Sequence, residues 1–349
     1  MKRVGIMTFQ YAYNFGAMLQ AYALKRTVED LTGYEVELIN YKPAKYVLGD
    51  EDCGNPKYLM QREKLNGFAR KYHGIDAAPT SSITDISEYD YYITGSDQVW
   101  NPLLPVRDRS SEYFLDFVPN NKVKIAYAAS VAQKVTEENE LSIFRENVPR
   151  FDYLSVREQS FCSFIESFTD KKCHGVFDPT LLLDSSQYED MVLSKKCDKD
   201  FLLAVVYNKL FKAKVNDTVN RYTIKNNQSV INMERNITSY TFLNEEESIF
   251  YSGIEEMLWA IKNAKMVVTD SFHFMVFSII FHKPFWAIVD GPRASRLRDL
   301  LSYLQLEDRI FNDSLSLEDM DKEIDYDKVD KLIKEKREYS LNFLREALK

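Results

Sequence analysis

The sequence lacks the features that would place it at once among membrane, metal-binding or repeat proteins. No run approaches the ~18 apolar residues that a membrane-spanning helix needs. The four cysteines (Cys53, Cys162, Cys173 and Cys197) form no Cys-x-x-Cys or Cys/His pattern, so they indicate a reducing compartment and no metal site. There is no internal repeat, low-complexity tract or long Gly/Ser linker. We therefore expect a globular cytoplasmic protein.

The chain also lacks an excess of positive charge. Lys and Arg number 45 against 53 Asp and Glu, a net charge of -8, which argues against nucleic acid as a main partner. With 45% hydrophobic and 28% charged residues, the composition is that of a folded, water-soluble protein. Thr8 and Gln10 interrupt the first apolar stretch, so a strand is expected there rather than a signal peptide. A length of 349 residues fits two domains.

Short β-rich runs alternate with helical patterns along the whole chain, which predicts α/β domains with parallel sheets covered by helices. The expected strands are Arg3–Thr8, Glu35–Asn40, Tyr91–Thr94, Val123–Ala128, Tyr153–Val156, Phe201–Tyr207, Ser229–Asn232, Lys265–Thr269 and Pro284–Val289. The expected helices include one that ends near Gly33, then Lys212–Lys225, Gly253–Asn263, Ser271–Phe281 and Ala294–Gln305. We place a first domain at 1–178, a second at 179–312 and a helical tail at 313–349, which packs back on the first domain in one interpretation.

One stretch, Lys57–Gly74, departs from the acidic average, with five basic residues against Glu63 alone. Tyr58, Leu65, Phe68 and Tyr72 share one face of a helix there. A helix packed on its own domain is the favoured interpretation. The alternative is a docking face for an acceptor carried on an anionic membrane, which would make the protein peripheral at the inner face of the membrane.

Four polar segments follow predicted strands directly, and the carboxyl ends of strands in open parallel sheets face the ligand crevice. These segments are Tyr13–Gln20, Gly95–Asn101, Ser155–Gln159 and Thr269–His273. In the last, Asp270 or Ser271 can cap a buried helix and leave His273 in its first turn, where the helix dipole favours an anion. His273 could donate a proton or hydrogen bond to a phosphate or carboxylate, although a buried core histidine is the alternative.

Arginines are the next candidates for holding an anion. Arg157 follows a short strand, where its planar fork suits a carboxylate or phosphate, and an ion pair with Glu158 or another acid is an equal alternative. Arg293 and Arg296 lie near the start of a later helix, and Arg296 could instead pair with an acid.

The first two polar segments fit a sugar acceptor. Asp97, Gln98 and Trp100 offer a carboxylate, an amide and an indole, which suit sugar hydroxyls and a pyranose face, and Asp97 could activate a hydroxyl as a base. Equally, Trp100 could fill the core and Asp97 cap the loop. Asn14 and Gly16 are expected to shape the first loop and present its backbone N–H groups.

The motifs ITGSDQVWN, SVRE, DPTLLL and TDSFHFMVFSIIFHKPFWAI, with the opening GIMTFQYAYNFGAMLQAYAL, resemble the polysaccharide pyruvyl transferase family from residue 4 to about residue 310. The resemblance implies two Rossmann-like domains facing across a cleft, similar to GT-B glycosyltransferases. It implies transfer of the enolpyruvyl unit of phosphoenolpyruvate onto a hexose hydroxyl pair of a surface polysaccharide, with phosphate as leaving group and no metal or further cofactor. The acceptor could be lipid-linked.

Carried over to this chain, the donor would be held by Arg157, His273 and either Arg293 or Arg296, with Ser271 at the helix start. From the residues themselves, we assign Asn14, Gly16, Asp97, Gln98 and Trp100 to the acceptor and expect His273 and Asp97 to be the catalytic pair.

The chain departs from relatives at Phe274 and Met275, where they carry Gly and a small residue, and at Gln10 and Tyr13, where they often carry His. Two alternatives therefore stay open. One is a sugar-nucleotide glycosyltransferase of GT-B type, for which we find no carboxylate placed to bind a ribose. The other is a catalytically silent glycan-binding protein, which the bulky Phe274 and Met275 would explain.

Overall fold

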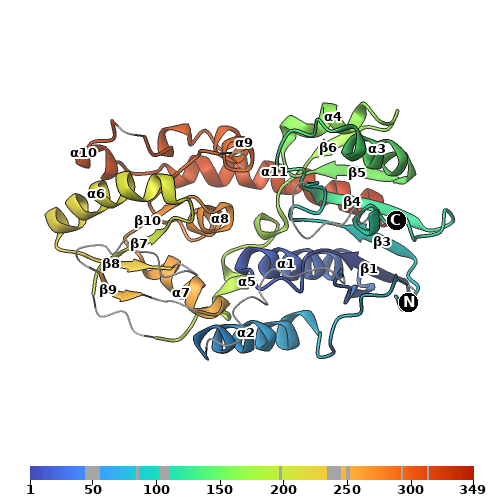
Figure 1. Ribbon diagram of the computed structural model, residues 1–349, viewed down its shortest axis with the longest axis horizontal. Coiled ribbons are helices and arrows are strands. Elements are labelled where there is room, and N and C mark those ends of the chain that lie inside the picture. Colours follow the sequence, from blue (N-terminus) through green and yellow to red (C-terminus); the bar gives the residue numbers. More distant parts are fainter. Residues whose placement is uncertain are drawn as a thin grey trace. The chain divides into compact units, whose positions relative to one another are not determined.

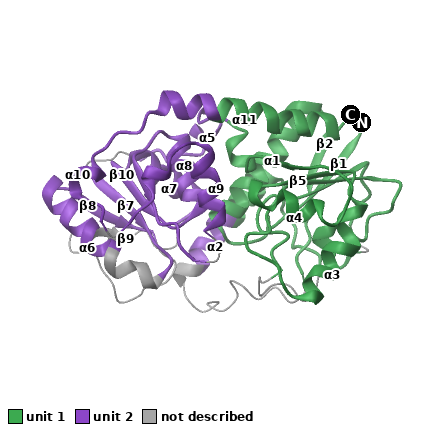
Figure 2. Ribbon diagram, turned by 90° about the horizontal axis from the view of Figure 1, so that it is seen from above, with its two compact units in different colours: residues 1–53, 66–183, 333–349 green, residues 54–65, 184–332 purple. Residues whose placement is uncertain are grey.

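A computed structural model describes residues 1–43, 56–83, 86–102, 111–195, 199–233, 245–248, 252–291, 294–312 and 314–349. The chain forms two compact units, coloured separately in Figure 2. Unit 1 comprises Met1–Cys53, Asn66–Leu183 and Ile333–Lys349, and unit 2 comprises Gly54–Leu65 and Asp184–Leu332.

Unit 1 contains a six-stranded parallel sheet in the order β2-β1-β3-β4-β5-β6 (Figure 1). Its strands are β1 (Arg3–Met7), β2 (Glu35–Leu38), β3 (Tyr91–Thr94), β4 (Val123–Ala129), β5 (Tyr153–Val156) and β6 (Cys173–Gly175). Its helices are α1 (Phe15–Thr32), α3 (Glu138–Asn147) and α4 (Cys162–Glu166), with short turns at η1 (Ala69–His73), η3 (Ser111–Phe114), η4 (Val148–Arg150), η5 (Gln159–Phe161) and η6 (Pro179–Leu181). Helix α1 ends at Gly33, which takes the left-handed conformation with φ 65° as the sequence predicted.

Unit 2 contains a five-stranded parallel sheet in the order β11-β10-β7-β8-β9. Its strands are β7 (Phe201–Val205), β8 (Ser229–Asn232), β9 (Glu245–Ser248), β10 (Met266–Thr269) and β11 (Phe285–Ala287). The helices are α5 (Ser186–Glu189), α6 (Lys209–Asn226), α7 (Ile254–Asn263), α8 (Phe272–Ile280), α9 (Ser295–Tyr303) and α10 (Leu317–Met320), with a short turn at η7 (Glu307–Arg309). Every strand predicted from the sequence is present, within two residues at each end.

Two helices contribute residues to both units. Helix α2 (Pro56–Phe68) belongs to unit 2 up to Leu65, and α11 (Tyr326–Ala347) belongs to unit 1 from Ile333 onward. The tail predicted at 313–349 is therefore helical over α11, which forms its larger part. Within unit 1 it is anchored by Ser340, whose hydroxyl accepts the backbone N–H of Phe177 at 3.0 Å.

The basic stretch that begins in α2 is packed into the protein. Leu65 and Phe68 are fully buried, and the Phe68 and Tyr72 rings both contact Tyr22 of α1. The His73 imidazole Nε2 lies 2.9 Å from the Met18 carbonyl oxygen. From Asn66 onward this confirms the interpretation of a helix packed on its own domain, whereas the part up to Leu65 belongs to unit 2. In the described part of the chain, no helix is both long enough and apolar enough to cross a membrane.

Candidate functional site

Three of the four polar segments that the sequence singled out lie at one edge of the unit 1 sheet. They follow β1, β3 and β5, and because all strands of this sheet are parallel, the carboxyl ends of the three strands share an edge. Gln20 of α1 connects two of the segments directly, since its Oε1 accepts the backbone N–H of Ser96 at 3.0 Å. The fourth segment, Thr269–His273, lies at the corresponding edge of the unit 2 sheet, after β10.

The loop after β3 holds Asp97 in an unusual conformation. Gly95 has φ 111°, and a Cβ atom there would lie 2.1 Å from the Tyr127 carbonyl oxygen, so only glycine fits. Asp97 itself has φ 63°, a left-handed conformation that costs free energy for a residue with a side chain. Its carbonyl oxygen accepts the Ser130 N–H at 2.9 Å, which ties the loop to the segment after β4. The carboxylate is 8% exposed at the end of its strand, and Oδ1 accepts the Gln98 N–H at 2.8 Å.

Trp100, on the same loop, is part of the core. Its side chain is fully buried, its ring stacks on Phe114 with centroids 5.1 Å apart, and its Nε1 donates to the Tyr113 carbonyl oxygen at 3.2 Å. In this structure the indole has no exposed face for a sugar, so we leave Trp100 out of the acceptor site proposed below. Gln98 is half-buried, and its Oε1 accepts a hydrogen bond from Asn101 at 2.9 Å.

Asn14 and Gly16 shape the loop after β1. Asn14 is the N-cap of α1, with Oδ1 accepting the Ala17 N–H at 3.1 Å, and Gly16 is buried within the first turn of that helix. The amide oxygen of Asn14 thus satisfies a backbone group of the protein, as a capping residue does.

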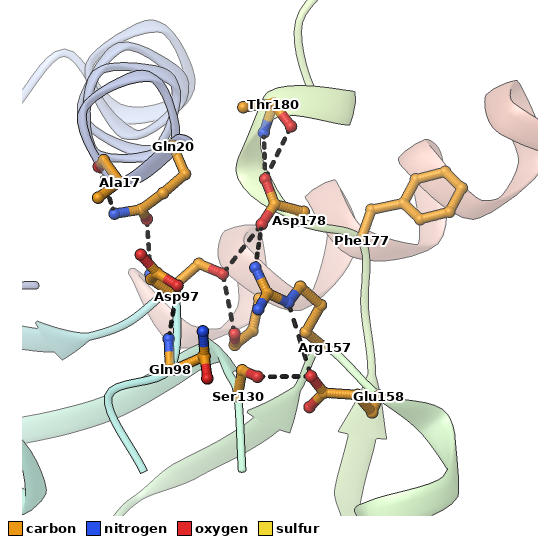
Figure 3. Close-up of polar contacts among 12 residues, drawn as sticks. Ala17, Gln20, Asp97, Gln98, Ser130, Arg157, Glu158, Phe177, Asp178 and Thr180 are labelled. Carbon is orange, nitrogen blue, oxygen red and sulfur yellow. Dashed lines mark hydrogen bonds and ion pairs between the residues drawn. The ribbon is translucent and has the colours of Figure 1, made fainter. Parts of the chain in front are cut away.

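Arg157 is enclosed by carboxylates within unit 1 (Figure 3). Its Nη1 lies 2.7 Å from Asp178 Oδ2 and its Nε lies 3.7 Å from Glu158 Oε1, and the three side chains are at most 3% exposed. Burial lowers the pKa of Arg157, but Asp178, Glu158 and Asp97 together raise that pKa above its usual value. Of the two alternatives left open by the sequence, the ion pair is the one formed here.

Figure 3 also shows residues of this edge that the sequence reasoning did not select. Asp178 accepts hydrogen bonds from Arg157 and Thr180, and Glu158 accepts one from the Ser130 hydroxyl at 2.5 Å. Asp178 belongs to the DPTLLL motif, which supported the family resemblance, but it was assigned no role in a site from the sequence. An acidic residue directly after the apolar pair Val176 and Phe177 was the available signal.

In unit 2 the segment after β10 leads into α8. His273 is in the first turn of this helix and is 7% exposed. The prediction that Asp270 or Ser271 caps the helix is confirmed for the position of Ser271, which is the N-cap, but no side-chain capping bond forms. The Asp270 carboxylate instead accepts the N–H groups of Tyr207 at 3.0 Å and Asn208 at 2.7 Å. Asp270 is used this way because the loop after the neighbouring strand β7 presents two N–H groups to it.

A cation lies next to the start of α8. The Arg296 guanidinium carbon is 5.9 Å from the centre of the Phe272 ring, and Phe272 is the first residue of the helix. The other arginine candidate, Arg293, lies outside the described residues. Phe274 and Met275 are 2% and 0% exposed and form part of the core around α8. Among the described residues, no group of three or more His, Cys, Asp or Glu side chains is placed to hold a metal ion.

Comparison with known proteins gives a family and a fold. The family model described as polysaccharide pyruvyl transferase matches residues 14–291. No curated protein matches the chain. Among solved structures, MnaA of S. aureus with UDP has a TM-score of 0.52 at 12% identity, covering 99% of this chain and 91% of that one.

Two further structures give the same result. The UDP-GlcNAc 2-epimerase of Methanocaldococcus jannaschii with UDP-GlcNAc and UDP has a TM-score of 0.50 at 12% identity, covering 97% and 94% of the two chains. The corresponding enzyme of Neisseria meningitidis bound to UDP-GlcNAc has a TM-score of 0.50 at 9% identity, covering 99% and 94%. At such identities the likeness concerns the fold, which is α/β with Rossmann-like parallel sheets of GT-B type.

Proposed function

The chain belongs to the polysaccharide pyruvyl transferase family, a family of transferases, and we propose that it moves the enolpyruvyl unit of phosphoenolpyruvate onto two hydroxyls of a hexose. The hexose would belong to a surface polysaccharide or its precursor, and phosphate would be released. The observation that carries the proposal is the family match over residues 14–291 combined with His273 at the start of α8.

The proposed donor residues are His273, Ser271 and Arg296 of unit 2. Phosphoenolpyruvate is a compact anion with up to three negative charges, and it needs concentrated positive potential. The N-terminal end of the nine-residue helix α8 carries partial positive charge from the helix dipole, and Arg296 adds a full charge beside Phe272. His273, in the first turn, is suited to donate a hydrogen bond to the phosphate as it leaves.

The proposed acceptor residues are Asp97 and Gln98 of unit 1. A carboxylate and an amide at the end of β3 offer acceptors and donors for sugar hydroxyls. Asp97 is the proposed base that takes a proton from the attacking hydroxyl. Because the loop is fixed through Gly95 and Ser130, this carboxylate is held in one place before substrate arrives, which favours catalysis by orientation.

The reaction balances without an outside oxidant or reductant. One sugar oxygen bonds to C2 of the enolpyruvyl unit, a proton is added to the C3 methylene, and the C2–O bond to phosphate breaks. The second sugar hydroxyl then closes the cyclic ketal on C2. Of the two hydroxyl protons, one balances the new methyl group and the other leaves on phosphate. The site would act by stabilising the charge that moves onto the phosphate.

One assay tests the proposal against its alternatives. The purified protein is incubated with phosphoenolpyruvate and a panel of glycans, and phosphate release and acceptor mass are followed. Phosphate release that depends on both substrates, with a mass gain of one pyruvyl unit, is the expected result. Nucleotide release from a sugar nucleotide would support a glycosyltransferase instead, and glycan binding without turnover would support a silent homologue.

A further inference from the structure

The Asp178 carboxylate joins three segments of unit 1. Its Oδ2 accepts from Arg157 Nη1 at 2.7 Å and from the Ser96 hydroxyl at 3.3 Å. Its Oδ1 accepts from the N–H and the hydroxyl of Thr180 at 3.1 and 2.7 Å. Ser96 immediately precedes Asp97 on the loop after β3, so a single carboxylate, 1% exposed, contacts that loop, the end of β5 and the turn η6.

The charges around Arg157 show what its guanidinium does in this structure. Asp178 and Glu158 are fully buried against it, and Asp97 is a further carboxylate that acts on it electrostatically. In the described part of the chain, the guanidinium thus contacts two buried carboxylates, and Asp97 adds negative charge nearby. If phosphoenolpyruvate bound to the same guanidinium, its negative charges would be repelled by these buried carboxylates. The repulsion is strong because the protein interior has a low dielectric constant. The guanidinium therefore serves to hold the Asp178 and Glu158 carboxylates in place.

We infer that Asp178 is a positioning residue, which holds the Asp97 loop at the end of β3 through its hydrogen bond with Ser96, while Arg157 holds the Asp178 carboxylate in place. The catalytic consequence rests on the proposed function, because it takes Asp97 to be the base. The positioning itself does not, since it can be measured without substrate.

Two substitutions separate the contacts. Asp178→Asn removes the charge and, in either orientation of the amide, places an NH₂ donor against Arg157 and Ser96 or against Thr180, all of which are donors. Ser96→Ala removes only the hydroxyl, whose single proton is shared between the Ala128 carbonyl oxygen at 3.0 Å and Asp178 Oδ2 at 3.3 Å. It leaves the buried ion pair intact and carries the test if Asp178→Asn does not fold.

The first measurement is amide hydrogen exchange of residues 96–101 in the free protein. We expect exchange about tenfold or more faster in both variants, because the loop loses a restraint at its first residue. The matched control is Asp152→Asn, whose carboxylate accepts the Lys124 N–H at 2.9 Å at the start of β4. The control should leave exchange in 96–101 unchanged. Unchanged exchange in a folded Asp178 or Ser96 variant would overturn the inference.

The second measurement compares the change in kcat with the change in affinity for phosphoenolpyruvate. For both variants we expect kcat to fall about tenfold to hundredfold while the apparent Kd for phosphoenolpyruvate, from thermal stabilisation, stays within about threefold. A loss of donor affinity as large as the loss in kcat would make Arg157 a donor ligand and overturn the inference. If the wild-type protein neither binds nor uses phosphoenolpyruvate, the proposed function fails, and hydrogen exchange still decides the positioning role.

Discussion

The Ser340 hydroxyl accepts the backbone N–H of Phe177 at 3.0 Å across 163 residues of sequence. The same hydroxyl donates to the Lys336 carbonyl oxygen of α11 at 2.8 Å. Because Phe177 precedes Asp178, this contact ties the C-terminal helix to the segment that enters the buried network of unit 1. The helix that closes the sequence is therefore a structural part of the site region.

Ser340→Ala should destabilise the protein by about 1–3 kcal/mol, because the buried N–H of Phe177 loses its acceptor. Urea unfolding followed by circular dichroism measures the change. Ser163→Ala, at an exposed position of α4, is the control and should change the free energy of unfolding by less than about 0.5 kcal/mol. Equal effects of the two substitutions would show that the contact contributes nothing.

His273→Ala should lower kcat by about 10²- to 10⁴-fold, the range expected for loss of a group that transfers or stabilises a proton. Far-UV circular dichroism should stay unchanged. His282→Ala is the control in the same unit, since its half-exposed imidazole lies 3.0 Å from Asp330 and stacks on Tyr326. Turnover near the wild-type rate in the His273 variant would remove this residue from the mechanism.

Arg296→Ala should weaken the binding of phosphoenolpyruvate by about tenfold, because it removes a full charge beside the first residue of α8. The apparent Kd from thermal stabilisation at rising donor concentration reports this. Arg298→Ala, on the same helix with an exposed side chain that reaches the Val289 carbonyl oxygen, is the matched control. Identical donor affinities in the two variants would exclude Arg296 from the donor site.

Trp100→Ala should lower the free energy of unfolding by about 3–5 kcal/mol, since it empties a fully buried site against Phe114. Trp100→Phe should cost less and leave the KM for the acceptor within about twofold. Unfolding in urea and steady-state kinetics at varied acceptor measure the two effects. An acceptor KM raised tenfold in a Trp100→Phe protein of normal stability would restore the indole as a sugar platform.

The stability of the protein should fall between pH 7 and pH 4 partly through His73. Burial lowers the pKa of His73 to about 4, below the value of 6.5 for the unfolded chain. Between these values the unfolded state binds more protons, so the full contribution is present above pH 6.5 and is lost as pH falls through 4. The loss is about 3 kcal/mol.

His73→Gln isolates this contribution, because an amide can still donate to the Met18 carbonyl oxygen but does not titrate. Urea unfolding of both proteins at pH 7, 5.5 and 4 is the measurement. The wild-type protein should lose about 3 kcal/mol more than the variant over this range. Parallel loss in both would mean that His73 is accessible to protons in the folded state.

The sequence predicted the secondary structure well where strands are apolar and helices amphipathic. It missed β6 and β9, whose sequences are CHG and EEES, because neither carries the branched or aromatic residues typical of strands. Such short edge strands form because a neighbouring parallel strand supplies hydrogen-bond partners, which is information that lies elsewhere in the chain.

The sequence alone also indicated that the polar segments after the strands of one sheet share an edge. Parallel strands bring their carboxyl ends to the same edge whatever their order in the sheet. Which partner each polar side chain takes was decided by the tertiary structure. Arg157 and Asp178 are separated by 21 residues, and Asp270 reaches N–H groups 62 and 63 residues away. Local spacing fixes the position of a side chain on its own strand or helix. The charges and N–H groups that contact this side chain depend on how distant segments of the chain pack together. A buried polar group must pair with one of them, because leaving it without a partner costs free energy.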